Sequence, residues 1–452
     1  MRVTRGQRSF TVDVAPDGEG LVSHAGAALL AEAADRVGLT GELSAALEGV
    51  RERRARHDPG RVIRDLAVML ADGGDCLSDL RAVRDQQPLF GPVASDSTAF
   101  RLIDRIAEEP ELLDAVRAAR GRARVRAWGL GVRPQRIVID IDATLITAHT
   151  EKEGAAVNFK SGFGFHPLFA YLDESREALA AILRPGGAPA HSAQAQFDVL
   201  DRALGQLPVE VASDLDTEIV MRIDAAGAAT SLCQAAQDAG INFVVGFDLH
   251  TGVREAILSL PEDAWRAAIR QDGSERDGAQ VAEITDIERL DLTPWPDGSR
   301  VIVRRERPHP GAQLSFTDHE GHRFQATLTD LKGDVVEIER LHRGRANTED
   351  RIRAAKQTGI ENLPFREFDL NAIWLELSLI AQDLIAWTQT LCLEGQLAIC
   401  EPKALRYRLL HTAGRLSFHA RRAVLRLQAS WPWAYQLAAA FARLRALPLP
   451  AG

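Results

Sequence analysis

The sequence predicts an α/β protein in which a mixed β-sheet with helices packed on it carries a β-rich insertion and is flanked by helical regions. Three patterns predict this class. Strands rich in β-branched residues alternate with helical segments over residues 131–247, alternating runs and turn residues fill 248–335, and apolar residues recur at helical spacing elsewhere. We therefore divide the chain into a helical region at 1–130, a first core segment at 131–247, the insertion at 248–335, a second core segment at 336–392 and a C-terminal helical region at 393–452.

Length and composition are those of a soluble globular protein. The 452 residues can form more than one domain, and 46% of them are hydrophobic against 26% charged. The four cysteines show no C-x-x-C pairing, which fits a reducing cytoplasm better than a disulfide framework or a zinc site. The N-terminus MRVTRGQRSF lacks an apolar signal region and no run approaches a membrane span. We expect a cytoplasmic protein with no membrane partner.

The charge pattern leaves a nucleic-acid partner open. A formal net charge of −9 argues against such a partner for the chain as a whole. The arginines, however, are concentrated at 51–64, 117–136 and 403–426, which indicates basic surfaces on an acidic protein. Solubilising helix faces are the alternative interpretation.

The N-terminal region is expected to be helical. Residues 27–37 and 59–70 are apolar at helical spacing, and Pro59 falls in the first turn of the second segment. Ser95 or Asp96 is a suitable N-cap for a third helix that runs through Ile106. A small helical domain with an arginine-rich exit suits binding of DNA ends, although no helix-turn-helix can be assigned.

The first core strand carries two aspartates on one face. RIVIDIDATLI places Ile137, Ile139 and Ile141 on one side and Val138, Asp140, Asp142 and Thr144 on the other. Two aspartates on an apolar strand are costly unless they hold a cation or hydrogen bonds. Strands at 166–172 and 178–183 complete an antiparallel meander, and the strand at 218–224 ends in Asp224. Helices at 194–204 and 228–238 and a strand at 241–247 then imply a mixed sheet.

A helical stretch at 342–356 contains the pattern R-x3-E-x6-K. At about 100° per residue, Arg345, Glu349 and Lys356 share one stripe, and His342 lies near its edge. A carboxylate flanked by cations could hold a metal while the cations hold phosphates. A solvated helix with ion pairs four residues apart is the alternative. Residues 371–391 form a long apolar helix, and 402–447 is expected to be helical and rich in arginine.

Three carboxylates could therefore form one site. Asp142, Asp224 and Glu349, if brought together on a sheet, could bind two divalent cations, and oxygen ligands favour magnesium or manganese over zinc. Spacing in the sequence does not show that they converge.

These motifs resemble the DDE transposases of bacterial insertion sequences, in the group marked by Y-x2-R-x3-E-x6-K. The chain matches this signature with His342 in place of the tyrosine, and it matches the D-x-T motif at Asp142 and the Arg-x-Asp motif at Asp224. The stretches SGFGFHPLFAYLDE and RYRLLHTAGRLSFHARRAVLRL…WPW are similar to the insertion sequence thirteen-eighty family in particular.

The resemblance implies an RNase H-like core that binds terminal inverted repeats, cleaves DNA at the element ends and joins 3′-hydroxyl ends to target DNA. It also implies a homodimer on double-stranded DNA and a location at the nucleoid. The implied site residues are Asp142, Asp224 and Glu349 as ligands of two Mg²⁺ or Mn²⁺ ions, Asp140 as the alternative first ligand, Arg345, Lys356 and His342 at backbone phosphates, and Trp265 and Trp295 stacked on a flipped base. For each tryptophan, packing in a small β core is the alternative.

Two rival functions stay open. IVIDIDATL also fits the first motif of haloacid-dehalogenase-like phosphatases, with Asp140 as nucleophile and Asp142 as general acid/base, and SDLDTE at 213–218 would supply the acidic motif. That assignment leaves the R-x3-E-x6-K helix unexplained. The second rival is an inactive, transposase-derived protein that only binds DNA.

Overall fold

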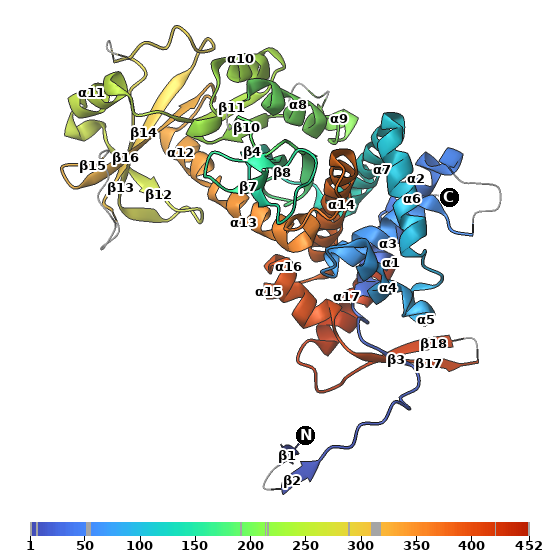
Figure 1. Cartoon of the computed structure of the whole chain (residues 1–452). Coiled ribbons are helices and arrows are strands. Elements are labelled where there is room, and N and C mark those ends of the chain that lie inside the picture. Colours follow the sequence, from blue (N-terminus) through green and yellow to red (C-terminus); the bar gives the residue numbers. More distant parts are fainter. Residues whose placement is uncertain are drawn as a thin grey trace.

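A computed structural model describes residues 2–5, 8–50, 56–189, 192–212, 214, 217–287, 290–308, 318–420 and 422–450. The first five residues of the basic segment at 51–64, and three residues of the acidic run at 213–218, lie outside these ranges. A long mixed sheet and its helices form one side of the molecule, and the N-terminal helices form the other (Figure 1).

The core of the sheet is the expected meander followed by parallel strands. β4 (Ile137–Ala143), β8 (Leu168–Leu172) and β9 (Ala178–Ile182) pair antiparallel in sequence order. β10 (Ile219–Ile223) pairs parallel with β4, and β11 (Asn242–Phe247) pairs parallel with β10. Parallel neighbours end at the same edge of a sheet, so the ends of β4 and β10 lie side by side.

The two faces of β4 pack into two different hydrophobic cores, in line with the alternation of its residues. Ile139 and Ile141 belong to the main hydrophobic core, whereas Val138 packs with Val220 and Val244 in a second core on the opposite face. A strand buried on both faces suits the centre of a sheet that has helices on both sides.

Residues 248–335 extend this sheet instead of forming a separate unit. After α11 (Thr251–Ser259), the chain adds β12 (Arg266–Ile269), β13 (Glu275–Glu283), β14 (Arg300–Glu306) and β16 (His322–Thr329), with the short β15 (Asp318–His319) beside β16. β16 pairs antiparallel with β11, so the strand order is β12-β13-β14-β16-β11-β10-β4-β8-β9.

Helices cover the sheet and lead to the rest of the molecule. α8 (Ala193–Leu204) and α10 (Thr230–Asp238) pack beside the core strands, and α12 (Val335–Arg343) contacts β11 to β14. α13 (Ala346–Ala355) is separated from α12 by a two-residue turn. The prediction of one continuous helical stretch at 342–356 is therefore wrong, because the turn at Gly344 and Arg345 divides it.

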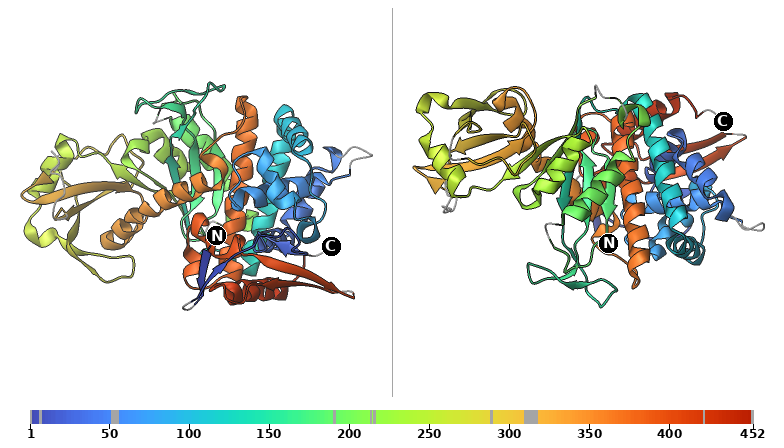
Figure 2. Two further views of the ribbon diagram at one scale, coloured as in Figure 1. Left: turned by 60° about the horizontal axis from the view of Figure 1, so that its bottom comes forward. Right: turned by 90° about the horizontal axis from the view of Figure 1, so that it is seen from above.

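α14 (Phe368–Cys392) is the central helix of the molecule. It packs on β9 on one side and on α3 (Pro59–Ala71) on the other, so it lies between the sheet and the N-terminal helices (Figure 2). Within the described ranges we find no helix that is both long enough and apolar enough to cross a bilayer.

The N-terminal region is mainly helical, as predicted. Its longer helices are α1 (Ala27–Arg36), α2 (Leu39–Ala46), α3, α6 (Asp96–Glu108) and α7 (Pro110–Ala127), and its short ones are α4 (Arg81–Arg84) and α5 (Gln87–Phe90). Pro59 occupies the first turn of α3, and the side chain of Ser95 accepts a hydrogen bond from the Thr98 N–H to cap α6. β1 (Arg2–Arg5) and β2 (Arg8–Thr11) form a separate pair.

Two arginines of the second basic segment are buried, which corrects the expectation of a basic surface at these positions, whereas Arg122, Arg133 and Arg136 are exposed. On α7, Arg120 and Arg124 are buried, and Arg124 Nε lies 2.9 Å from Glu177. Arg124 also pairs with Asp383 of α14, and Arg120 pairs with Glu376 at 2.8 Å. These arginines join α7 to α14 and are not available to DNA.

The C-terminal region is not wholly helical as expected. After the short α15 (Gln396–Ile399) and α16 (Pro402–Leu405), the basic stretch forms the hairpin β17 (Gly414–His419) and β18 (Arg422–Leu427), and β17 also pairs with β3 (Leu21–Val22). Leu416 faces Leu425 across the hairpin while Arg415 and Arg426 face solvent, an alternation typical of a strand with one covered face. The chain ends in α17 (Ala434–Ala446).

Candidate active site

Asp142 and Asp224 converge on one guanidinium group at the ends of two neighbouring strands. Asp142 lies near the end of β4, and Asp224 directly follows β10. Arg345 Nη2 is 3.2 Å from Asp142 Oδ2 and 3.4 Å from Asp224 Oδ2. The parallel pairing of β4 and β10 brings these carboxylates together across more than 80 residues of sequence, as expected from their positions at strand ends.

The two carboxylates differ in environment. Burial, opposed by Arg345 and assisted by the charge of Asp224, raises the pKa of Asp142 to about 6. The carboxylate of Asp142 also accepts a hydrogen bond from the Ala143 N–H at 2.9 Å. Asp224 is more exposed and accepts a hydrogen bond from the Gly227 N–H at 2.8 Å. Two carboxylates held close together with one of them largely buried are costly unless a cation accompanies them.

The raised pKa predicts a pH-dependent effect of Asp142→Asn on stability. A carboxyl whose pKa is about 6 in the fold, against an ordinary value of 3.8, destabilises the fold as the pH rises through this interval. With divalent ions chelated, the variant should match the wild type near pH 4 and be more stable by on the order of 1–3 kcal/mol at pH 8. Urea unfolding at both pH values measures this difference, and an equal difference at both would contradict the assigned cause.

Asp140 has a structural role on the same face of β4. It is buried and forms a two-point ion pair with Arg222 of β10, at 2.5 and 2.7 Å. Arg222 also reaches Asp173 at 2.9 Å and the carbonyl oxygen of Leu341. This pairing favours Asp142 over Asp140 as the first ligand. It also argues against the phosphatase alternative, because a buried, paired Asp140 cannot attack a substrate.

Gly344, at the turn between α12 and α13, lies close to Arg222. A Cβ atom at Gly344 would lie 2.6 Å from Arg222 Nη1, so a larger residue there would require this guanidinium to shift. The sequence marked Arg222 only as part of a motif, and Asp173 was not marked at all. Their role could not be read from the sequence because the partners come from four separate elements.

His342 lies on α12 and not on the stripe of α13, which corrects the expectation of a shared face. Its Nδ1 is 3.1 Å from Thr327 Oγ1 on β16, and the ring is half-buried. Burial and the nearby charges of Arg222 and Arg345 lower the pKa of His342 to about 3. The imidazole is therefore neutral, and it joins α12 to the sheet.

α13 carries Glu349, and Lys356 directly follows this helix, near the ends of the strands. Glu349 lies one turn after Arg345 on the same side of the helix and is exposed. Lys356 Nζ donates a hydrogen bond to the carbonyl oxygen of Leu145, just after β4, at 3.1 Å. Glu349 therefore lies between two contacts that face the ends of β4 and β10. In the described part of the chain, Asp142, Asp224 and Glu349 do not form a group with ligand atoms within 4.8 Å of one another.

The donor atoms at this site fit divalent cations. Two aspartate oxygens face one positively charged nitrogen, so the negative charge of this site is already balanced in part by a cationic group. Arg345 Nε is buried and has no hydrogen-bond partner among the described residues, so this guanidinium is only partly satisfied where it lies. Carboxylate oxygens are the ligands that Mg²⁺ and Mn²⁺ prefer.

The two tryptophans expected to stack on DNA are packed against protein. Trp265 is 8% exposed, and the guanidinium carbon of Arg305 lies 4.4 Å from its ring centre. Trp295 is half-buried and packs edge-on against Phe247 at 5.5 Å. These contacts favour the alternative that both are core residues of the extended sheet.

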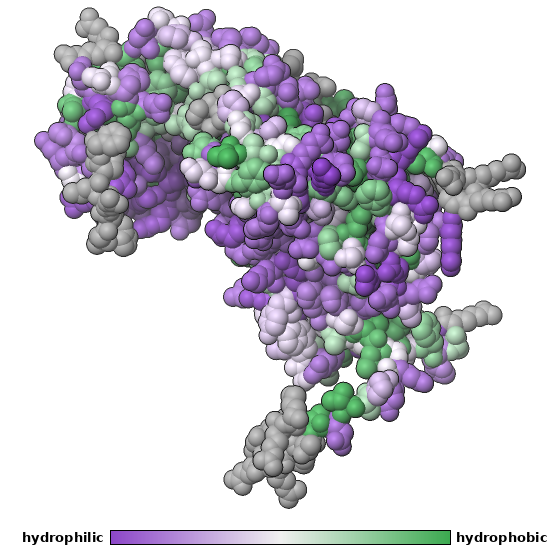
Figure 3. All heavy atoms as spheres, viewed as in Figure 1, coloured by the Kyte–Doolittle hydropathy of each residue, from purple (hydrophilic) through white to green (hydrophobic). Residues whose placement is uncertain are grey.

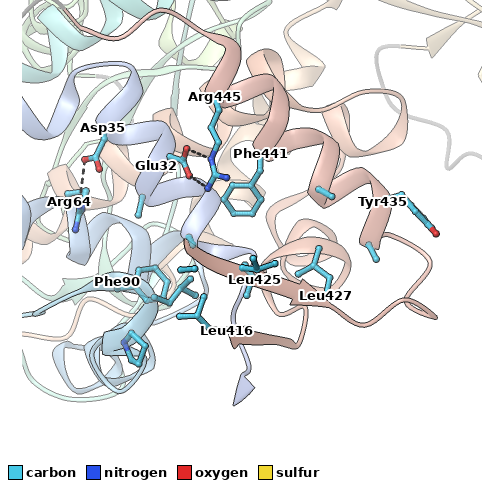
Figure 4. Close-up of a pocket in the computed structure, with 18 of the residues that line it drawn as sticks. Glu32, Asp35, Arg64, Phe90, Leu416, Leu425, Leu427, Tyr435, Phe441 and Arg445 are labelled. Atoms are coloured by element: carbon cyan, nitrogen blue, oxygen red, sulfur yellow. Dashed lines mark hydrogen bonds and ion pairs between the residues drawn. The ribbon is translucent and has the colours of Figure 1, made fainter. Parts of the chain in front are cut away.

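A large cavity in the described part of the chain lies away from the three carboxylates. It measures about 830 Å³ and is formed by α1, α5, the β17–β18 hairpin and α17, with an ion pair between Glu32 and Arg445 on its wall (Figure 4). Hydrophobic side chains gather on the surface where the hairpin and α5 meet (Figure 3). None of the three carboxylates lines this cavity.

Comparison with known proteins identifies the family. A profile described as "Transposase DDE domain group 1" matches residues 5–449. The chain is also similar to a solved structure, the cryo-EM structure of the piggyBac transposase synaptic complex with hairpin DNA. That similarity has 12% sequence identity and a TM-score of 0.40, and it covers 85% of this chain and 80% of the other. No curated protein matches the chain. Because the family profile covers nearly the whole sequence, the chain belongs to the DDE transposases of domain group 1.

Proposed function

We propose that this protein binds the terminal inverted repeats of a mobile element, cleaves DNA at the element ends and joins the 3′-hydroxyl ends to target DNA. The observation that supports this most directly is the convergence of Asp142 and Asp224 on Arg345, with Glu349 one turn further along α13. Membership of the family supports the same class of reaction.

Asp142, Asp224 and Glu349 are the proposed ligands of two Mg²⁺ or Mn²⁺ ions. Bound ions of this kind stabilise the charge that develops on phosphate oxygens during phosphoryl transfer. Burial disfavours the ionised form of Asp142, and a divalent cation bound beside it would offset this cost. Asp224 is held at the end of β10 by its hydrogen bond from Gly227, and its second oxygen lies 3.4 Å from Arg345 Nη2.

Arg345 and Lys356 are the proposed contacts to backbone phosphates next to the cut. Arg345 exchanges its two carboxylates for a phosphate when the carboxylates hold cations, which its unpartnered Nε supports. Lys356 lies beside the end of β4. To bind a phosphate, its ammonium group would give up one hydrogen bond, to the Leu145 carbonyl oxygen. His342 acts by positioning α12, since a neutral half-buried ring adds no charge toward DNA.

The finer classification is also a proposal. The order of a meander followed by two parallel strands, with Asp142 on the first strand and Asp224 after the fourth, supports an RNase H-like core. The R-x3-E-x6-K match supports a bacterial insertion-sequence transposase of the insertion sequence thirteen-eighty family. Such enzymes pair two ends, so we propose a homodimer on DNA. The exposed side chains of Phe418 and Tyr435 support a contact between copies in the C-terminal region.

A cleavage assay tests the proposed function. Full-length protein is incubated with DNA that carries the flanking ends of its own element, with Mg²⁺, Mn²⁺ or a chelator. We expect nicks at the ends that require the metal, and complexes that contain two protein copies and two ends. Asp224→Asn should bind these ends with unchanged affinity and leave them intact.

The outcomes separate the competing functions. Binding of the ends without cleavage by the wild type, in either metal, would favour the inactive DNA-binding protein. Cleavage that persists in Asp224→Asn at the wild-type rate would show that this carboxylate is not a ligand. Complexes with a single protein copy would contradict the dimer while leaving the chemistry in place.

A further inference from the structure

A second group of metal-ligating side chains lies away from the carboxylates of the active site. It consists of His24, just before α1, Asp72, at the C-terminal end of α3, and His411, just before β17. One ligand atom from each lies within 4.8 Å of the other two. These residues are separated by 48 and 339 positions, so no spacing in the sequence reveals them.

The contacts within this group are those of a preformed site. Nδ1 of His24 contacts Asp72 Oδ2, and Nε2 of His411 lies 3.0 Å from the backbone oxygen of Asp72 and 3.3 Å from its Oδ1. The two imidazole rings lie 4.4 Å apart between their centres and are tilted by 31°. Asp72 is 6% exposed, whereas both histidines are partly open to solvent.

Asp72 supplies the second observation that points to a ligand. Its Oδ1 atom is buried and makes no hydrogen bond within the described residues, although the His411 ring is close. A buried carboxylate oxygen without a hydrogen bond is costly. The three side chains also line a cavity of about 450 Å³, which gives an ion and its water access to them.

We propose that His24, Asp72 and His411 bind one divalent transition-metal ion of the zinc class. Two imidazole nitrogens and one carboxylate oxygen are a common ligand set for Zn²⁺, which keeps a fourth position for water. This set differs from the all-oxygen donors of the active site, so Mg²⁺ is not its ion. On binding, the contact between His24 Nδ1 and Asp72 Oδ2 would be replaced by a bond from each side chain to the ion.

The ion would hold together the segment before α1, the C-terminal end of α3 and the segment before β17. Beside the site, the Gly26 N–H donates to the Leu410 carbonyl at 3.1 Å and the Ala25 N–H donates to the Thr412 carbonyl at 3.0 Å. β3 and β17 pair immediately beyond these contacts.

Residues beside this site also contact the short helical turn that follows α13, Lys356–Ile360. Arg406 Nη1 donates to the carbonyl oxygens of Ala71, at 3.3 Å, and of Gln357, at 2.9 Å. Ala71 precedes the ligand Asp72, and Gln357 follows Lys356. The proposed metal site thus lies next to the hydrogen bonds by which Arg406 holds the segment just after α13.

Zinc binding by the full-length protein tests this proposal. Equilibrium dialysis against Zn²⁺ in excess Mg²⁺, which occupies the active site, should give one tightly bound zinc per chain. His24→Ala and His411→Ala should each weaken binding by more than about tenfold, the loss that even an outer partner of a metal site can cause. His319→Ala is the matched control, because His319 lies exposed on β15 and should leave binding unchanged.

Two further measurements keep the test independent of folding defects. Wild-type protein with Co²⁺ should show the visible absorption of a low-coordinate nitrogen and oxygen site, and Zn²⁺ should displace it. Asp142→Asn should bind zinc as the wild type does. No saturable zinc binding by the wild type, or binding by both histidine variants as tight as that of the wild type, would overturn the proposal. Loss of zinc in Asp142→Asn alone would place the ion in the active site instead.

Discussion

Glu349→Gln should abolish metal-dependent cleavage of the element ends and leave binding of those ends intact. The substitution keeps the size of the side chain on α13 and removes the charge that a divalent ion needs. Since bound ions contribute several kcal/mol to phosphoryl transfer, we expect a loss of roughly a thousandfold in the rate of strand cleavage. Single-turnover cleavage and a gel-shift titration on the same DNA measure the two properties separately.

Asp350→Asn is the matched control for this variant. Asp350 is the next residue on α13, is exposed, and pairs only on the surface with Arg353 at 2.8 Å. Its substitution should leave the cleavage rate within about twofold, since exposed pairs contribute little. If Glu349→Gln cleaved as fast as Asp350→Asn, Glu349 would not be the third ligand.

Arg124→Met should produce the largest loss of stability. The substitution leaves the buried carboxylates of Glu177 and Asp383 without their shared cation at the contact between α7 and α14. Removal of one partner from a buried ion pair costs about 3–5 kcal/mol in the free energy of unfolding. Chemical denaturation followed by circular dichroism measures this change.

Arg122→Met, on the same helix, is its control. Arg122 is half-exposed and pairs with Glu42 at the surface, so its loss should cost less than about 1 kcal/mol. Equal stability of both variants would show that the buried cluster is not a major source of stability. A stable Arg124→Met variant that had lost affinity for DNA would instead indicate that Arg124 belongs to a basic surface that binds DNA, as the sequence predicted.

The local elements of this protein could be predicted from the sequence because their signals are local. The β-branched run of β4 and the cap at Ser95 each depend on residues within one turn or one strand. The C-terminal hairpin was missed because RLSFHARRAVLRL is rich in arginine, and its alternation becomes decisive only when β3 supplies a partner strand.

The roles of the arginines could not be predicted in the same way. Arg124 and Arg222 read as basic residues in the sequence, but both are buried among carboxylates contributed by other elements. An arginine buried with its partners and an arginine free to bind phosphate have the same local sequence. Only the packing of α7 on α14, and of β10 beside β4, separates the two cases.

The sequence by itself determined the residue types of the active site and the family to which the chain belongs. The D-x-T, Arg-x-Asp and R-x3-E-x6-K motifs mark Asp142, Asp224 and Glu349 through order and spacing along the chain. The tertiary structure decided which of these groups meet. Parallel pairing of β4 with β10 brings Asp142 and Asp224 together, and both carboxylates contact Arg345, the residue that precedes α13. Convergence of side chains depends on distances between elements, and the linear sequence contains no such distances.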